Sequence, residues 1–310
     1  MGWGLGANDS ANIFGTGVAS GLIRYRTAVL VTAIFVILGA MLEGRKCITT
    51  ISDLTSLSPL FSFICLIAAA LTIAVLTFYA IPASTSQAIV GSLMGIALQS
   101  GHHPDYRLLI KIVICWICTP IGGIIFSVLL FRILKLLFLD RVKSVTILNL
   151  LFTFGILITG TYGAYALGAN NVANVTGVYV ASGILLPFHA ALIGGLSIAI
   201  GVLTYSKKTM MTVGKGIVPL DPFSAMITVF SEALTLHVFT QVGVPVSSSQ
   251  AVVGAVVGIG FARDYRTINY RMFGKIAIGW ICTPLAAGLL ALSLLFAVRQ
   301  LPELPYYCFF

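Results

Sequence analysis

The sequence GANDSAN occupies residues 6–12, and the closely related GANNVAN occupies residues 168–174. Both stretches lie inside or beside long apolar segments. Asparagine and aspartate form helices poorly and are costly to place in lipid. Their joint occurrence, twice in so apolar a chain, predicts a polar site at membrane depth rather than a pair of ordinary turns.

The composition is that of an all-α polytopic membrane protein. Hydrophobic residues make up 58% of the 310 positions and charged residues 9%, with a mean hydropathy of +1.04, whereas soluble domains carry roughly 25% charged residues. The uncharged apolar runs, each near the roughly 20 residues that cross a bilayer as a helix, are 60–80, 112–131, 145–167, 188–205 and 276–298. We therefore expect a multi-pass protein of the cell membrane, surrounded by lipid, without a soluble domain.

The charges and cysteines exclude several other classes. The net charge of +9 comes from basic residues in short loops between apolar runs, as the positive-inside rule describes, and does not indicate nucleic-acid binding. Cys115 and Cys118 form a C-x-x-C pattern, but it lies within an apolar run beside Trp116, which favours packing over metal or redox chemistry.

The chain contains an internal duplication. PASTSQAIVG at residues 82–91 matches PVSSSQAVVG at 245–254, and WICTP at 116–120 matches WICTP at 280–284. Together with the opening motif, three motifs recur in one order at a nearly constant separation, which predicts two transmembrane repeats over residues 1–140 and 145–310.

The loop charges predict that the two repeats are inverted. Arg24 and Arg26 follow the first motif, whereas the equivalent loop near residues 185–187 is uncharged. In the later pair of equivalent loops the second half is the more basic one, since residues 262–275 carry more basic residues than residues 99–111. Inverted repeats favour alternating access with binding near the bilayer midplane, although a channel can also be duplicated. Because only residues 1–5 precede the first motif, the first repeat is expected to lack most of its first helix.

The two serine motifs predict an anion site. The apolar stretches that follow them, 88–98 and 251–262, are too short to span a bilayer and fit re-entrant hairpins or broken helices. Proline and serine suit a helix start, where free N–H groups and the helix dipole attract anions. Two such ends facing each other would form a donor-rich cage for a tetrahedral oxyanion, although simple capping is the alternative. The candidate substrate-binding residues are Ser84, Thr85, Ser86, Gln87, Ser247, Ser248, Ser249 and Gln250.

The asparagine motifs predict a cation site beside the anion site. Carbonyl groups of unwound helices, together with carboxylates, commonly bind hard cations such as Na⁺. The alternative is an asparagine hydrogen-bond ladder that packs helices together. Glu232, inside the run 223–242, could be a cation ligand, a proton carrier or the partner of a lysine. The candidate cation-binding residues are Asn8, Asp9, Asn12, Asn170, Asn171, Asn174 and Glu232.

These paired motifs resemble the inorganic phosphate transporter (PiT) family, which has a duplicated GANDVAN signature, over nearly the whole chain. The resemblance implies a secondary transporter that imports inorganic phosphate by symport with Na⁺ or H⁺, built as an inverted-repeat helical fold with two hairpins. By motif position, residues 84–87 and 247–250 would cradle phosphate, and the asparagine motifs would shape the cation sites. Asn171 stands where the family usually has aspartate, which leaves the number of coupled cations open.

Two rival functions remain open at this point, and a third is disfavoured. The nearest is a symporter of another tetrahedral oxyanion such as sulfate, and the second is a passive anion channel. An intramembrane enzyme for phosphoryl groups is disfavoured, because the sequence offers no catalytic histidine–carboxylate pair and no metal-binding spacing among its four histidines. We expect no cofactor beyond the coupling ion Na⁺ or H⁺, and such transporters also allow a homodimer.

Overall fold

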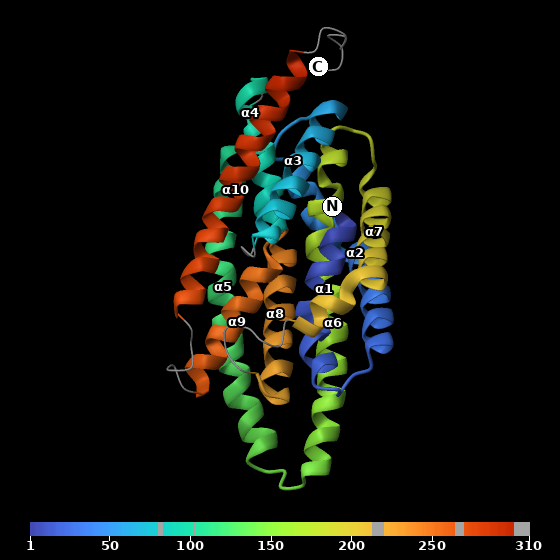
Figure 1. The fold of residues 1–310 in the computed structure, drawn as a ribbon, viewed down its shortest axis with the longest axis vertical. Helices are drawn as coiled ribbons and strands as arrows, with labels where there is room; N and C mark the ends of the chain where they lie inside the picture. Colours follow the sequence, from blue (N-terminus) through green and yellow to red (C-terminus); the bar gives the residue numbers. More distant parts are fainter. Residues whose placement is uncertain (80–82, 102, 213–219, 264–269, 301–310) are drawn as a thin grey trace.

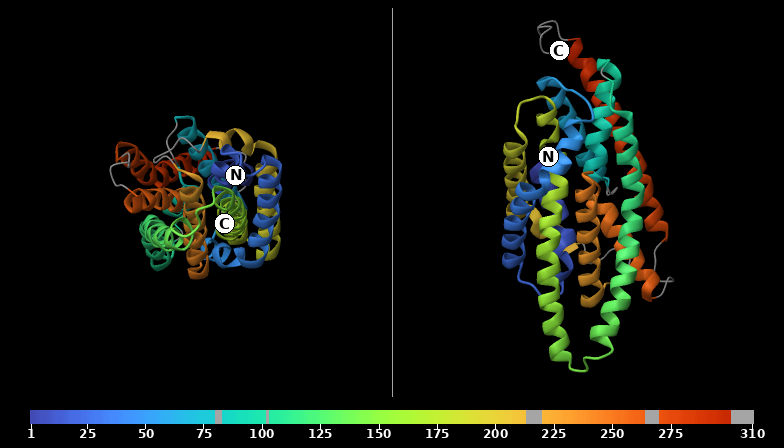
Figure 2. Two further views of the ribbon diagram at one scale, coloured as in Figure 1. Left: turned by 90° about the horizontal axis from the view of Figure 1, so that it is seen from below. Right: turned by 180° about the vertical axis from the view of Figure 1, so that it is seen from behind.

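A computed structural model describes residues 1–79, 83–101, 103–212, 220–263 and 270–300. Within these residues the chain folds as an elongated bundle of helices without strands, and α5 and α6 project beyond the others at one end (Figures 1 and 2). The elements are α1 (Gly2–Ala19), α2 (Tyr25–Ser52), α3 (Pro59–Phe78), α4 (Thr85–Ser100), α5 (Tyr106–Leu134), the π-helical turn η1 (Lys135–Leu139), α6 (Val145–Ala181), α7 (Pro187–Thr212), α8 (Pro222–Val242), α9 (Ser248–Arg263) and α10 (Tyr270–Arg299).

The helix lengths agree with a multi-pass membrane protein. In the described part of the chain, seven helices are long and apolar enough to cross a membrane, namely α2, α3, α5, α6, α7, α8 and α10. The helices α4 and α9, which follow the two serine motifs, have only 16 residues each. The prediction of an all-α polytopic membrane protein is confirmed.

The short helices form two hairpins. In hairpin 1, α3 and α4 pack together, and in hairpin 2, α8 and α9 do so. The hairpins enter from opposite ends of the molecule, so the starts of α4 and α9 lie near its middle (Figure 1). Ser84 and Ser247 cap these starts, each accepting a hydrogen bond from the backbone N–H three residues later, at 3.4 and 3.3 Å. The hairpins predicted from the serine motifs are therefore present; Pro82 lies outside the described residues.

The backbone at the two asparagine motifs differs from the prediction. Both motifs lie within continuous α-helix, in α1 and α6, so their carbonyl groups are engaged in intrahelical bonds. The expectation of unwound backbone carbonyls as cation ligands is wrong. The motif glycines serve close packing instead: a Cβ on Gly6 would lie 1.9 Å from the carbonyl oxygen of Ile198, and one on Gly168 would lie 2.0 Å from that of Val36.

The two halves make reciprocal contacts. Helix α1 packs on α7 as α6 packs on α2, and α4 packs on α10 as α9 packs on α5. A Cβ on Gly91 or on Gly254 would lie 2.2 Å from the carbonyl oxygen of Pro284 or Pro120, which are equivalent positions of the two WICTP motifs. In Figure 1, α1 runs towards the end of the bundle from which α6 rises. These contacts support the inverted repeat, which stays a prediction, as does the division at residues 1–140 and 145–310.

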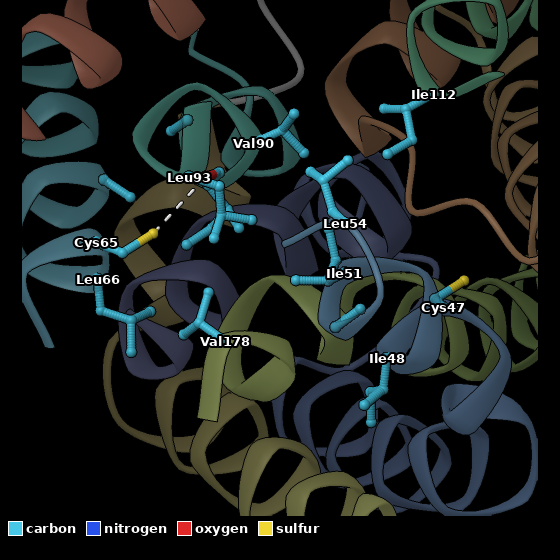
Figure 3. Packing of buried hydrophobic residues seen from close by; sticks show 14 of the residues in the cluster. Cys47, Ile48, Ile51, Leu54, Cys65, Leu66, Val90, Leu93, Ile112 and Val178 are labelled. Carbon is cyan, nitrogen blue, oxygen red and sulfur yellow. Dashed lines mark hydrogen bonds between the residues drawn. The ribbon is translucent and has the colours of Figure 1, made fainter. Parts of the chain in front are cut away.

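An apolar core fixes hairpin 1 against its surroundings. Figure 3 shows Ile48 and Ile51 of α2, Leu66 of α3, Leu93 of α4 and Val178 of α6 among the side chains of this cluster. Their burial holds the start of α4 beside the motif of α6, where the polar groups of the site lie.

We expect Gly254→Ala to destabilise the protein. The added methyl group would overlap the Pro120 carbonyl of α5, and overpacking of this kind costs about 1–3 kcal/mol. Gly4→Ala is the matched control, because nothing lies within 4 Å of its added Cβ. The measurement is the melting temperature in detergent; equal temperatures for the two variants would contradict this close approach of α9 and α5.

Candidate functional site

The start of hairpin 2 bonds to the motif of α1. The Ser248 hydroxyl donates a hydrogen bond of 2.7 Å to one carboxylate oxygen of Asp9, and the Asn8 amide donates one of 3.1 Å to the other. Asp9 is only 5% exposed. A buried carboxylate needs such donors, because its charge has lost the stabilisation that water provides.

The start of hairpin 1 bonds to the motif of α6, but through a different position of the motif. The Asn174 amide donates hydrogen bonds to Asn171 Oδ1 at 2.9 Å and to Thr85 Oγ1 at 3.4 Å. Thr85 and Ser248 occupy the same position in the two serine motifs. Each hairpin therefore presents its helix start to the asparagine motif of the other half, and four elements meet at one polar centre.

The two helix starts are rich in hydrogen-bond donors. Ser84 and Ser86 lie 3.2 Å apart between their hydroxyl oxygens, and Ser247 and Ser249 lie 2.8 Å apart. The first N–H groups of α4 and α9 have no intrahelical partners, and each helix dipole is positive at this end. The substrate candidates with buried side chains are Ser84, Ser86, Gln87, Ser247, Ser248 and Gln250.

Glu232 is a buried carboxyl group without a bonding partner. It lies on α8, is 2% exposed, and neither of its oxygens has a hydrogen-bond partner among the described residues. Pairing with a lysine, one of the predicted alternatives, is therefore wrong for the part of the chain described. Helix α8 also contacts α1, which carries the buried Asp9, so these two helices contribute two buried acidic groups that a cation or a proton would stabilise.

Other buried polar atoms at the motifs have unused bonding capacity. The amide oxygens of Gln87, Gln250 and Asn174 and the amide nitrogen of Asn171 are buried without a partner among the described residues. Ser10 Oγ is in the same condition, and sequence reasoning missed it because the second motif has Val172 at that position. Buried polar groups are normally satisfied, so such a concentration of unpaired atoms indicates a place where a ligand completes the bonding.

The structure gives Asn170 a different environment. Its amide donates to Thr240 Oγ1 at 3.0 Å and to the Val244 carbonyl at 3.2 Å, and its Oδ1 accepts from the Val246 N–H at 2.8 Å. Most of its bonding capacity is thus used to hold the connection between α8 and α9. Asn8 is exposed and Asn12 half-buried, so these three candidates are less closely joined to the centre than Asp9, Asn171 and Asn174.

The described residues contain no group of three or more histidine, cysteine or acidic residues that could hold a metal ion. The centre instead combines helix-start N–H and hydroxyl donors with a few carboxylate and amide oxygens. The donors suit an oxyanion, and the oxygens suit a hard cation such as Na⁺.

This architecture is that of a transporter for a small polar solute: two hairpins bring helix starts to a buried polar centre in a membrane bundle. The model of the phosphate transporter family matches residues 5–291. The chain therefore belongs to this family, whose members are phosphate transporters and not enzymes, and the resemblance drawn from the motifs is confirmed.

Relatives and a solved structure agree with this membership. A protein of Pyrococcus furiosus named "Putative phosphate permease" is 30% identical, with 94% of this chain and 92% of the relative covered. One of the same name from Methanocaldococcus jannaschii is 28% identical, covering 91% and 89%. A solved structure named "The sodium-dependent phosphate transporter" has a TM-score of 0.85 at 24% identity over 97% of this chain and 96% of that one, a likeness of fold.

Proposed function

We propose that this protein imports inorganic phosphate by symport with Na⁺, using the two hairpin starts as the phosphate cradle. The observation that carries the proposal is the pair of capped helix starts, α4 and α9, each bonded to the asparagine motif of the other half. Their free N–H groups, dipoles and serine hydroxyls supply donors to a tetrahedral oxyanion from two sides.

The centre also offers what distinguishes phosphate from sulfate. Phosphate carries one or two protons at neutral pH, so its site needs acceptors besides donors. The Asp9 carboxylate and the buried Asn174 Oδ1 are acceptors beside the helix starts. Sulfate, fully deprotonated, gains nothing from them, and an acidic group facing it is repulsive.

Na⁺ is the coupling ion that the oxygens of the centre favour. Asp9, Glu232 and the motif amides supply hard oxygen ligands, and Glu232 lacks any other partner among the described residues. Cations bound here would offset the charge of a multivalent anion and supply driving force from a gradient. The solved transporter of similar fold, which is named as sodium-dependent, points the same way. Symport with H⁺ is the alternative, because a buried carboxyl can carry a proton.

The test is uptake of labelled phosphate into proteoliposomes that contain the full chain. We expect uptake that requires an inward Na⁺ gradient, that excess sulfate leaves intact, and that Ser248→Ala weakens while Ser293→Ala does not, since Ser293 lies exposed on α10. Uptake driven by a proton gradient alone would assign H⁺, and inhibition by sulfate would change the substrate. Phosphate flux indifferent to both ions would indicate a channel.

A further inference from the structure

The connection between α8 and α9 is tied down from three neighbouring helices. From α6, Asn170 bonds to Val244 and Val246, as described above. From α2, the Thr50 hydroxyl donates to the carbonyl of Gly243, and from α5, the Lys111 ammonium donates to that of Val242 at 2.9 Å. These are carbonyls at the end of α8, which have no intrahelical partner and attract cations. These bonds hold hairpin 2 in this conformation. We call Asn170, its partner Thr240, Thr50 and Lys111 the latch residues.

The sequence repeats the latch residues in the other half. Asn8 matches Asn170 within the asparagine motifs. Thr77 stands as far before Pro82 as Thr240, the other Asn170 partner, stands before Pro245. Lys275 precedes the second WICTP motif by the same distance as Lys111 precedes the first. The residue equivalent to Thr50 is Thr212.

The two copies have different environments. Asn170 and Thr240 are both 0% exposed, whereas Asn8 and Thr77 are exposed. Helix α6 packs extensively along α8, but among the described residues α1 makes no comparable contact with α3. The end of α3, which precedes the connection of hairpin 1, is also exposed to the surroundings: Phe78 is 84% exposed. Asn170 thus bonds to the connection of hairpin 2, whereas Asn8 bonds to its neighbour Asp9 and, among the described contacts, not to hairpin 1.

We propose that Asn170 and Asn8 are alternating latches: Asn170 holds hairpin 2 in the present conformation, and Asn8 holds hairpin 1 in the opposite one. In that state the Asn8 amide would bond to Thr77 and to the backbone at Ala83, as Asn170 bonds to Thr240 and at Val246. The inference rests on the proposed transport function, because a transporter built from inverted repeats exchanges the environments of its two halves. Both asparagines are positioning residues that act through the hairpins.

The latches make a reciprocal prediction that a rigid structural role does not. Loss of Asn170 removes bonds that exist only in the present state, so the population shifts towards the opposite state. Loss of Asn8 removes its single bond to the neighbouring Asp9 in the present state, but in the opposite state it removes the larger set of bonds to hairpin 1, so the population shifts the other way. The release of one hairpin is therefore coupled to the fixing of the other.

The experiment measures the labelling rate of single cysteines by a membrane-impermeant maleimide. The reporters are Val246→Cys in hairpin 2 and Ala83→Cys in hairpin 1, placed in full-length protein in which all six native cysteines are replaced by serine or alanine. We expect Asn170→Ala to accelerate labelling at position 246 at least about tenfold and to slow it at position 83. Asn8→Ala should do the reverse at both positions.

Asn149→Ala is the matched control, an exposed asparagine on the same helix as Asn170, and should change neither rate. The proposal would be overturned if a variant changed the labelling rates at both positions in the same direction. It would also be overturned if labelling accelerated at position 246 without slowing at position 83. Asn8 is exposed, so its variant reports even if Asn170→Ala fails to fold. Labelling needs no substrate, so absent phosphate uptake with reciprocal labelling would refute only the proposed function.

Discussion

Replacement of Asp9 by asparagine is expected to lower Na⁺-dependent phosphate uptake at least about 100-fold. The carboxylate accepts hydrogen bonds from Ser248 and Asn8, so it fixes the start of hairpin 2 and places a negative charge beside the cradle. Bonds to charged groups are worth about 1.5–3 kcal/mol, and each 1.4 kcal/mol is about a factor of ten. The measurement is the initial rate of uptake into proteoliposomes at saturating Na⁺.

Asp140→Asn is the control for charge alone, because Asp140 is exposed between α5 and α6. Its uptake should match that of the unaltered protein. A fully active Asp9→Asn variant would argue against coupled symport, since only a passive channel is indifferent to loss of this carboxylate.

The second large effect is expected for Glu232→Gln. The neutral amide retains the size of the side chain and removes the charge that a bound Na⁺ would compensate. We expect the Na⁺ concentration for half-maximal uptake to rise at least about tenfold, whereas the half-saturating phosphate concentration at high Na⁺ stays unchanged, because Glu232 bonds to neither helix start among the described contacts.

The same variant separates the two coupling ions. If Glu232 carries a proton, Glu232→Gln removes the dependence of uptake on pH and leaves its response to Na⁺ as before, which would contradict the assignment to Na⁺. Ala69, the equivalent residue of the first half, has no carboxyl group. Ala69→Ser provides a conservative change at the matching place, and it should leave the response to Na⁺ intact.

Much of the architecture could be predicted because the motifs place polar residues next to apolar stretches within a membrane protein. Serines and glutamines directly before a short apolar stretch predicted a capped helix start, in a re-entrant hairpin or a broken helix, and α4 and α9 begin there. Helix propensity misled at the asparagine motifs, where it favoured unwound backbone. Tertiary packing overrides this weak preference: Gly6 and Gly168 let neighbouring backbones approach, and the polar side chains bond to other elements within intact helices.

The partners within the site could not be read from the sequence. Nothing in the duplicated motifs indicates that Asp9 bonds to the serine motif of the second half, or Asn174 to that of the first, because either pairing satisfies the same residue types. Equally, Asn8 and Asn170 stand in almost identical local sequences. Their different environments belong to one conformation, in which Asn170 is buried and Asn8 is exposed. Two matching stretches of sequence do not reveal such a difference.

The reciprocal glycine contacts constrain the order in which the protein is made. Gly91 of α4 rests on Pro284 of α10, and the intervening chain contains most of the molecule. The ribosome therefore releases hairpin 1 long before its packing surface exists, whereas α9 finds α5 already synthesised. The nascent first half therefore stays in the bilayer with the glycine face of α4 uncovered until α10 has been synthesised.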